Sequence, residues 1–429
     1  MSQVSYNCVN SVYFVGYVNI YWNHINMTSI SEETIYNIIE KIALGRNLKN
    51  WRCSQEKFES IAQNYFGVII PVVLTGEENG KLVSLKLALK LAPMDERYRV
   101  SGAVTRMFAR EIYVYSVIFK KYEEIQKNVS FTSSYIMPHC YYICKEYCKE
   151  VIAMQNMCGE DFKPFTSDMF LNLEHISIAL KSLAKLHALS YILKAREQTF
   201  YEEISKECLP LTIDTNKRYI DIMLDRLGKA IKKFEDSEYA PLFESLRENC
   251  AKCFEVVVSK GGSTCICHGD IWKENILFKY ENGIPTSACL IDYQTTRICS
   301  PAFDTLYLII SSTDSHLRKD HYNNLLDTYY HSFDQMLKEA SLNSANTYSR
   351  QMFDQDLELV WPACLITANT ALWLSSGLQE EGHVRSKKVW STPEEKERAS
   401  NSYKQIIKAI IDDFSCYGYL DLKSNCFCF

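Results

Sequence analysis

One short segment constrains this chain more than any other, because its polar residues stand at fixed intervals between apolar runs. The segment Cys267–Phe278 reads CHGDIWKENILF, and a later apolar run ends at Asp292. Short apolar runs of this kind predict strands, and the residues between them predict a loop. The loop would present His268, Asp270 and Asn275 together, with Asp292 at the end of the next strand.

Phosphoryl transfer requires side chains of these types. One carboxylate orients the attacking hydroxyl, while an amide and a second carboxylate hold magnesium on the triphosphate. We assign Asp270 as the base, and Asn275 and Asp292 as the magnesium ligands. His268 is expected to tie the loop to the strand after Asp292. The alternative, a polar loop with a capping aspartate and a turn asparagine, explains each residue singly but not the ordered set.

A lysine on the opposite wall of the site would contact the α- and β-phosphates. Lys90 stands at the end of an apolar strand predicted over residues 82–90, and Glu111 on the following helix is the candidate partner that holds it. Lys86 is a competitor, because strand alternation puts it on the same face as Lys90. We favour Lys90, since the strand ends directly after it. A solvated lysine at a strand edge is the alternative reading.

The order of the predicted elements indicates an α+β chain with two lobes. A helix begins at the N-cap Ser31, a hairpin covers residues 68–90, a helix covers 104–122, and two strands follow at 141–144 and 151–154. Further helices are predicted at 173–193, 219–234, 240–258, 303–311, 322–340, 354–378 and 404–414, with short strands at 264–267, 276–279 and 288–291.

These elements suggest three parts of the chain. We expect an N-terminal extension with one helix over residues 1–54, a β-rich N-lobe that binds nucleotide over 55–156, and a helical C-lobe over 157–429. The C-lobe would hold the catalytic loop and the substrate pocket. A cleft between two lobes is a natural place for a nucleotide.

Composition excludes several classes of function. The chain has 429 residues, a net charge of -5 and no basic run, which argues against nucleic-acid binding. No segment reads as a signal peptide or a membrane span. The 17 cysteines are scattered and odd in number. Reduced thiols in the cytoplasm are the simplest explanation, and we expect a cytoplasmic monomer.

At these residues the chain resembles the insect ecdysteroid kinase-like family and related choline- and aminoglycoside-kinase-like proteins. The likeness rests on four stretches: HGDIWKENILF at 268–278, Asp-Tyr-Gln at 292–294, SPAFDTLY at 300–307 and LAKLHALS at 183–190. It covers about residues 55–380. The resemblance implies a protein-kinase-like fold with a small β-rich N-lobe and a large helical C-lobe. It also implies ATP and Mg²⁺ as cofactors and a small-molecule alcohol, an ecdysteroid or a xenobiotic, as acceptor.

The resemblance also implies roles for single residues. Asp270 matches the catalytic aspartate, Asn275 and Asp292 match the magnesium ligands, Lys90 matches the ATP lysine and Glu111 its partner. Asp304 matches a buried aspartate that braces the catalytic loop. His187 is expected to be a structural core residue, because a polar residue on an apolar helix is usually a satisfied core group.

Two features depart from kinase patterns. The hinge reads Ala153-Met154-Gln155-Asn156-Met157, without the acidic residue usual in this family, and no G-x-G-x-x-G is present. The candidates for the turn that covers the phosphates are Gly67 and the turn at 76–80. These departures motivate an alternative function, a pseudokinase-like module that binds a lipophilic ligand without turnover. A protein kinase is the third possibility, and Asp-Tyr-Gln in place of Asp-Phe-Gly argues against it.

The acceptor pocket would be built from helices at 215–258 and 320–380. Tyr219, Phe353, Trp361 and Trp373 are candidate wall residues that would stack on a steroid. The alternative is that each belongs to the core. The sequence does not identify the acceptor alcohol.

Overall fold

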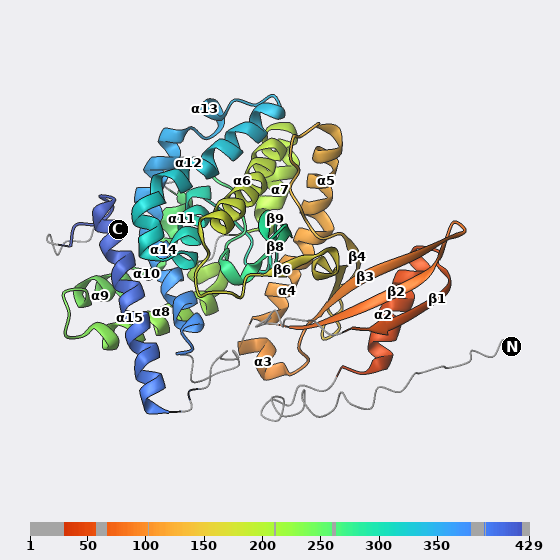
Figure 1. Cartoon of the computed structure of the whole chain (residues 1–429), viewed down its shortest axis with the longest axis horizontal. Coiled ribbons are helices and arrows are strands. Elements are labelled where there is room, and N and C mark those ends of the chain that lie inside the picture. The colour runs from red at the N-terminus through yellow and green to blue at the C-terminus, as the bar shows by residue number, and fades with distance from the viewer. Residues whose placement is uncertain are drawn as a thin grey trace.

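The N-terminal half is built on one antiparallel sheet (Figure 1). The computed structural model describes residues 30–56, 67–101, 103–209, 212–259, 263–378, 390 and 392–422. The sheet has the order β1-β2-β3-β5-β4, with β1 (Lys49–Gln55), β2 (Val68–Glu78), β3 (Lys81–Leu91), β4 (Cys140–Cys144) and β5 (Val151–Gln155). The predicted hairpin is confirmed as β2–β3. Its turn is Asn79-Gly80, where φ values of 53° and 76° suit the tight turns that join hairpin strands.

Helix α2 (Glu32–Gly45) packs on this sheet and is part of its core. The predicted cap is confirmed, because the Ser31 side chain accepts a hydrogen bond from the amide of Thr34. A row of isoleucines on α2 is buried together with Leu74, Leu87 and Leu89 of the sheet. An apolar helix face of this kind requires an apolar surface to cover it.

The boundary predicted between residues 54 and 55 falls inside strand β1. Strand β1 pairs with β2, and α2 packs beneath the sheet, so residues 30–55 belong to the N-lobe rather than to a separate extension. Residues 1–29 lie outside the described part of the chain.

Between β3 and β4 the chain runs through a helical connection that carries Glu111. It comprises α3 (Glu96–Ser101), α4 (Val104–Tyr113), a π-helical turn η1 (Val114–Ile118) and α5 (Phe119–Asn128). The predicted helix over 104–122 therefore exists. The structure adds a π-helical turn that the apolar period does not reveal, because one wider turn shifts the pattern only slightly.

The C-terminal half is mostly helical, which confirms the α+β class (Figure 1). Its helices are α6 (Leu173–Arg196), α7 (Gln198–Glu207), α8 (Ile213–Phe234), α9 (Ala240–Glu248), α10 (Cys250–Ser259), α11 (Pro301–Ser312), α12 (Ser315–Glu339), α13 (Ser344–Thr347), α14 (Arg350–Ser375) and α15 (Pro393–Cys416). The single helix predicted over 240–258 is two helices, separated at Asn249.

Two small sheets lie within this mostly helical part. One has the order β6-β8-β9, formed by β6 (Phe162–Pro164), β8 (Ile276–Glu281) and β9 (Ile284–Leu290), and the other pairs β7 (Cys265–Cys267) with β10 (Arg297–Cys299). Sequence analysis missed β6 and β10, because three-residue strands carry no usable period. The small sheets hold the two ends of the segment 267–278 in place.

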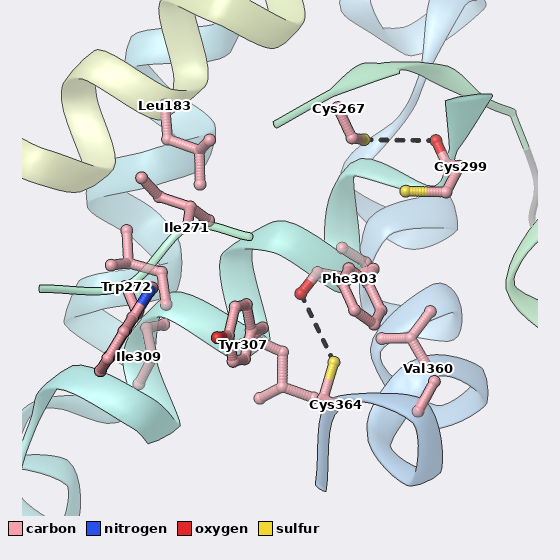
Figure 2. Close-up of a cluster of buried hydrophobic side chains, with 14 of the residues drawn as sticks. Leu183, Cys267, Ile271, Trp272, Cys299, Phe303, Tyr307, Ile309, Val360 and Cys364 are labelled. Atoms are coloured by element: carbon pink, nitrogen blue, oxygen red, sulfur yellow. Dashed lines mark hydrogen bonds between the residues drawn. The ribbon is translucent and has the colours of Figure 1, made fainter. Parts of the chain in front are cut away.

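Helix α11 lies in the centre of the C-terminal core, and all 12 of its residues are buried. It packs against α6, α12 and α14. Figure 2 shows Phe303 and Tyr307 of α11 between Leu183 of α6 and Val360 of α14. The Sγ of Cys364 on α14 lies 3.4 Å from the carbonyl oxygen of Phe303. Because α11 is enclosed on all sides, it is a rigid support for the loop beside it.

In the part of the chain that the structure describes, two helices, α6 and α14, are long and apolar enough by length and composition to cross a membrane. The sequence analysis counted uninterrupted apolar runs and did not single them out. In the structure, 78% of the apolar window of α6 and 83% of that of α14 is buried within the protein. Burial to this extent is typical of the core helices of globular domains.

The packing of α2 can be tested with two substitutions on that helix. Ile39→Ala removes a fully buried side chain at the contact with the sheet, and we expect it to lower the free energy of unfolding by about 2–4 kcal/mol. Leu44→Ala is the control, because Leu44 is 65% exposed on the same helix. Urea denaturation of both variants measures the difference. Equal effects would contradict the packing.

Candidate active site

The loop between β7 and β8 is held at its backbone from two sides. The Asp304 carboxylate of α11 accepts hydrogen bonds from the amides of His268 (2.6 Å) and Gly269 (3.1 Å). The guanidinium of Arg297 donates to the carbonyl oxygen of Gly269 at 2.7 Å. Gly269 has φ +87°, and a Cβ there would collide with Thr295 and Arg297. The loop therefore requires glycine at this position.

Asp270 follows directly and is partly buried. Its carboxylate Oδ1 accepts a hydrogen bond from the hydroxyl of Tyr307 at 3.1 Å. Burial, together with the nearby Asp292 carboxylate, raises the pKa of Asp270 to about 6, although Tyr307 and Arg297 act in the opposite direction. A carboxylate with a raised pKa is a stronger base than an ordinary aspartate, and it is still ionised near neutral pH.

Asn275 and Asp292 lie on either side of the β8–β9 hairpin. The Asn275 side chain donates to the carbonyl oxygen of Asp270 at 2.8 Å, and the Asn275 carbonyl accepts from the amide of Ile291 at 3.0 Å. Asp292 has φ 69°, a left-handed conformation that is uncommon for a non-glycine residue. Gln294 donates to its Oδ2 at 3.3 Å.

The donor set of these two residues fits magnesium. Because Asn275 uses its amide nitrogen for Asp270, its side-chain oxygen stays available, and Asp292 contributes a carboxylate lining the same pocket. Carboxylate and amide oxygens are hard ligands of the kind that Mg²⁺ prefers. No sequence signal indicates the strained backbone of Asp292, because a left-handed aspartate leaves no pattern in the neighbouring residues.

Lys90 is placed in the cleft and Lys86 is not. The Lys90 ammonium lies 2.5 Å from Glu111 and 3.0 Å from Asp292, while Lys86 donates to the carbonyl oxygen of Gly159 at 2.9 Å. Burial alone would lower the pKa of Lys90, but the two carboxylates outweigh it and raise the pKa. Lys90 therefore remains charged although it is almost fully buried.

His268, His187 and Asp304 form a buried network behind the loop. His268 Nε2 lies 2.9 Å from the carbonyl oxygen of Ile291, which precedes Asp292. His268 also contacts the chain after Asp292, because its ring centroid lies 4.7 Å from that of Tyr293 and its carbonyl oxygen accepts from the Thr295 hydroxyl at 3.4 Å. His187 contacts Asp304 at 3.3 Å and the hydroxyl of Tyr329 at 2.7 Å. Burial lowers the pKa of His268, which favours its neutral form. None of these three side chains lines the pocket described next.

A pocket of about 710 Å³, part of it open to solvent, lies between the two halves. Lys90, Glu111, Asn275, Asp292 and the hinge residues 154–158 contribute to its lining. Its other walls are largely apolar, and include Ile69, Ala88, Leu277 and Ile291.

The two candidate glycine turns lie at opposite ends of the β2–β3 hairpin. Val68 pairs with Leu91, so Gly67 lies at the end of the hairpin that carries Lys90. Glu78 pairs with Lys81, so the turn at 79–80 lies at the far end. The turn at 76–80 therefore lies at the end of the hairpin away from Lys90, and Gly67 is the candidate on the Lys90 side. Residues 57–66, which precede Gly67, lie outside the described part.

Three of the four candidate wall aromatics belong to the core. Phe353 is fully buried beside Tyr329, and Trp361 and Trp373 are almost fully buried. Tyr219 is half-buried, and its ring lies 6.0 Å from the guanidinium of Arg297. Only Tyr219 therefore remains near the loop. Sequence reasoning missed Arg297 and Tyr307, although Tyr307 follows Asp304 at a helical spacing of three.

Comparison with known proteins gives one strong match. The sequence model of the ecdysteroid kinase-like family matches residues 62–342. No curated protein matches the chain. Solved structures that match include a GDP complex of wild-type aminoglycoside 2'-phosphotransferase-IIIa, 13% identical over 88% of this chain and 99% of that chain, with a TM-score of 0.37. A glucosamine kinase is 12% identical over 88% of this chain and 83% of that chain, also with a TM-score of 0.37.

Asp270→Asn should stabilise the folded protein at pH 7. The folded-state pKa of Asp270 is raised to about 6, so ionising it disfavours folding, and this destabilisation grows as pH rises from about 4 to 6. An isosteric amide removes that penalty, which at about 1.4 kcal/mol per pKa unit is at most about 3 kcal/mol. Thermal denaturation at pH 7 and pH 4 measures it: the rise in Tm should be larger at pH 7. An equal or opposite shift would contradict the raised pKa.

Proposed function

We propose that this chain, which belongs to the ecdysteroid kinase-like family, transfers the γ-phosphate of ATP to a hydroxyl group of a small lipophilic alcohol, an ecdysteroid or a xenobiotic. The observation that carries this proposal is the convergence of Lys90, Glu111, Asn275 and Asp292 on one pocket, with Asp270 hydrogen-bonded to Asn275. Phosphoryl transfer depends mainly on positioning and charge stabilisation, and these residues supply both.

The pocket gives each part of a nucleotide a complementary surface. Apolar side chains such as Ala88 and Leu277 suit the faces of a purine ring, and the hinge residues 155–157 would lie along its edge. Lys90, held by Glu111, would neutralise charge on the α- and β-phosphates. Asn275 and Asp292 would hold magnesium, which supplies further positive charge to the phosphates when bound.

Asp270 would act on the acceptor. Its carboxylate accepts the proton of the alcohol as the alcohol oxygen bonds to the γ-phosphorus. The bond between that phosphorus and the bridging oxygen breaks, and its electron pair leaves with ADP. The products are a phosphate ester, ADP and a protonated Asp270, which then releases its proton to solvent. Lys90 would stay protonated throughout, because Glu111 contacts it and the phosphates would add further negative charge beside it.

A binding module without turnover is the weaker candidate. The reason to consider it is the hinge, which lacks an acidic residue. Yet Gln155, Asn156 and Met157 still line the pocket. The ion pairs that orient Lys90 are also complete. Measuring Tm with and without millimolar Mg-ATP distinguishes the kinase from the binding module, since a ligand that binds the native state must raise Tm. An unchanged Tm would favour the binding module.

The cytoplasm is the compartment we propose. All cysteines among the described residues are free thiols, and most are buried. Free thiols in this number suit a reducing environment.

The proposed activity predicts a specific loss. Purified protein with Mg-ATP should phosphorylate some member of a panel of ecdysteroids and xenobiotic alcohols, detected as a mass gain of one phosphate. Asp270→Asn should reduce kcat by at least about 100-fold, because the amide cannot accept the proton. Nucleotide binding should persist in this variant. Retained transfer would contradict the role of Asp270.

The rate should also depend on pH in a defined way. Because the pKa of Asp270 is about 6, kcat/KM should fall on the acid side with an apparent pKa near that value, as the base becomes protonated. An acid limb near pH 4 would indicate an ordinary aspartate instead. The profile of kcat/KM for Mg-ATP is measured between about pH 3.5 and 8, a range that covers both outcomes.

A further inference from the structure

Tyr307 contacts the side chain of the base, a role that the reaction above leaves unassigned. Its hydroxyl donates to Oδ1 of Asp270 at 3.1 Å, and the tyrosine is fully buried. Among the residues that the structure describes, this is the one hydrogen bond that the Asp270 carboxylate receives. One oxygen of the carboxylate is therefore fixed, while Oδ2 is left for another donor.

The position of the Tyr307 hydroxyl is set by the most enclosed helix of the protein. Figure 2 shows its ring in the core beside Phe303, and the two ring centroids lie 6.0 Å apart. Asp304 lies three residues earlier on the same helix, and its carboxylate binds the amides of His268 and Gly269. Residues three apart lie on one face of a helix. One face of α11 thus holds both the backbone of the loop and the side chain of Asp270.

The hydroxyl can act only as a donor toward Asp270. Burial, followed by the adjacent Asp270 carboxylate, raises the pKa of Tyr307 well above its ordinary value, so the proton stays on the tyrosine. Without this bond, the terminal torsion of an aspartate is broad and two-fold. The carboxylate would then spread over several orientations, and misplacement of a reacting group by about 1 Å can cost about 100-fold in rate.

We propose that Tyr307 is a positioning residue for phosphoryl transfer, which holds Oδ1 of Asp270 so that Oδ2 faces the acceptor hydroxyl. This inference rests on the proposed function of the site. It assigns no contact between Tyr307 and the substrate. Its effect reaches the reaction only through the orientation of Asp270.

The test is Tyr307→Phe, which removes the hydroxyl and keeps the buried ring. We expect kcat to fall at least about 10-fold, for transfer to an alcohol and for Mg-ATP hydrolysis with water as acceptor, while the KM for ATP changes less than about 3-fold. Tyr403→Phe is the matched control, because Tyr403 is equally buried but bonds Asn369. Its kcat should stay within about 2-fold of the wild type.

Two results would overturn the role of Tyr307 alone: an active wild type whose Tyr307→Phe variant keeps its kcat, or an equal loss in Tyr403→Phe. A wild type that neither transfers phosphate nor hydrolyses ATP would overturn the proposed function and this role with it. The two failures are therefore distinguishable.

A second measurement does not depend on turnover. Tm is determined for Tyr307→Phe, Asp270→Ala and the double variant. If the hydrogen bond exists in solution, the change in the double variant should differ from the sum of the two single changes, because contacting residues are coupled. Additive changes would show that the contact is absent and would overturn the proposal.

Discussion

The buried carboxylate of Asp304 is the interaction on which the site depends. It accepts hydrogen bonds from two consecutive amides of the loop between β7 and β8 and from His187, so its lone pairs are well used although the side chain is fully buried. Burial alone would raise the pKa of Asp304, but the hydrogen bond from His187 and the nearby positive groups lower it. An ionised carboxylate in such a place is tolerated only when its partners compensate for lost hydration. Loss of Asp304 would leave the loop amides unpaired.

The same physical balance is less favourable at Asp270, and the role of base proposed for this residue would explain the difference. Asp270 faces Asp292 and receives one hydrogen bond from the described residues, so ionisation is opposed rather than supported. Groups in active sites commonly have pKa values shifted in this way, since a base is useful when its proton affinity approaches the working pH. Asp304 thus has more hydrogen-bond partners than Asp270. This difference suits Asp304 to hold the loop and Asp270 to act as the proposed base.

Much of the fold was predictable, because the apolar periods of the hairpin, α6 and α14 are long and regular. The grouping of Lys90, Glu111 and Asp292 was also predictable, since Lys90 stands at the end of a clear strand, Asp292 follows another, and Glu111 lies on a clear helix. The inclusion of residues 30–55 in the N-lobe was not predictable, because β1 is mostly exposed and carries little apolar alternation. The core positions of Trp361 and Trp373 were not predictable either, since an aromatic residue in the sequence can belong to a core or to a pocket wall. Tyr307 and Arg297 act through tertiary contacts that no local pattern encodes.

The ion pair between Lys90 and Asp292 has a consequence for how a nucleotide enters the cleft. Lys90 belongs to the N-terminal sheet and Asp292 follows a strand of the C-terminal half, so their 3.0 Å contact joins the two halves by opposite charges. Without ligand, each charge already has a partner. If the proposed function holds, the arrival of a metal–triphosphate complex would be an exchange of ionic partners rather than the neutralisation of isolated charges. The phosphates would replace Asp292 as the partner of Lys90, and the metal would replace Lys90 as the partner of Asp292. The affinity would then report the difference between two sets of ion pairs, and an anion without its metal would leave Asp292 without a cation.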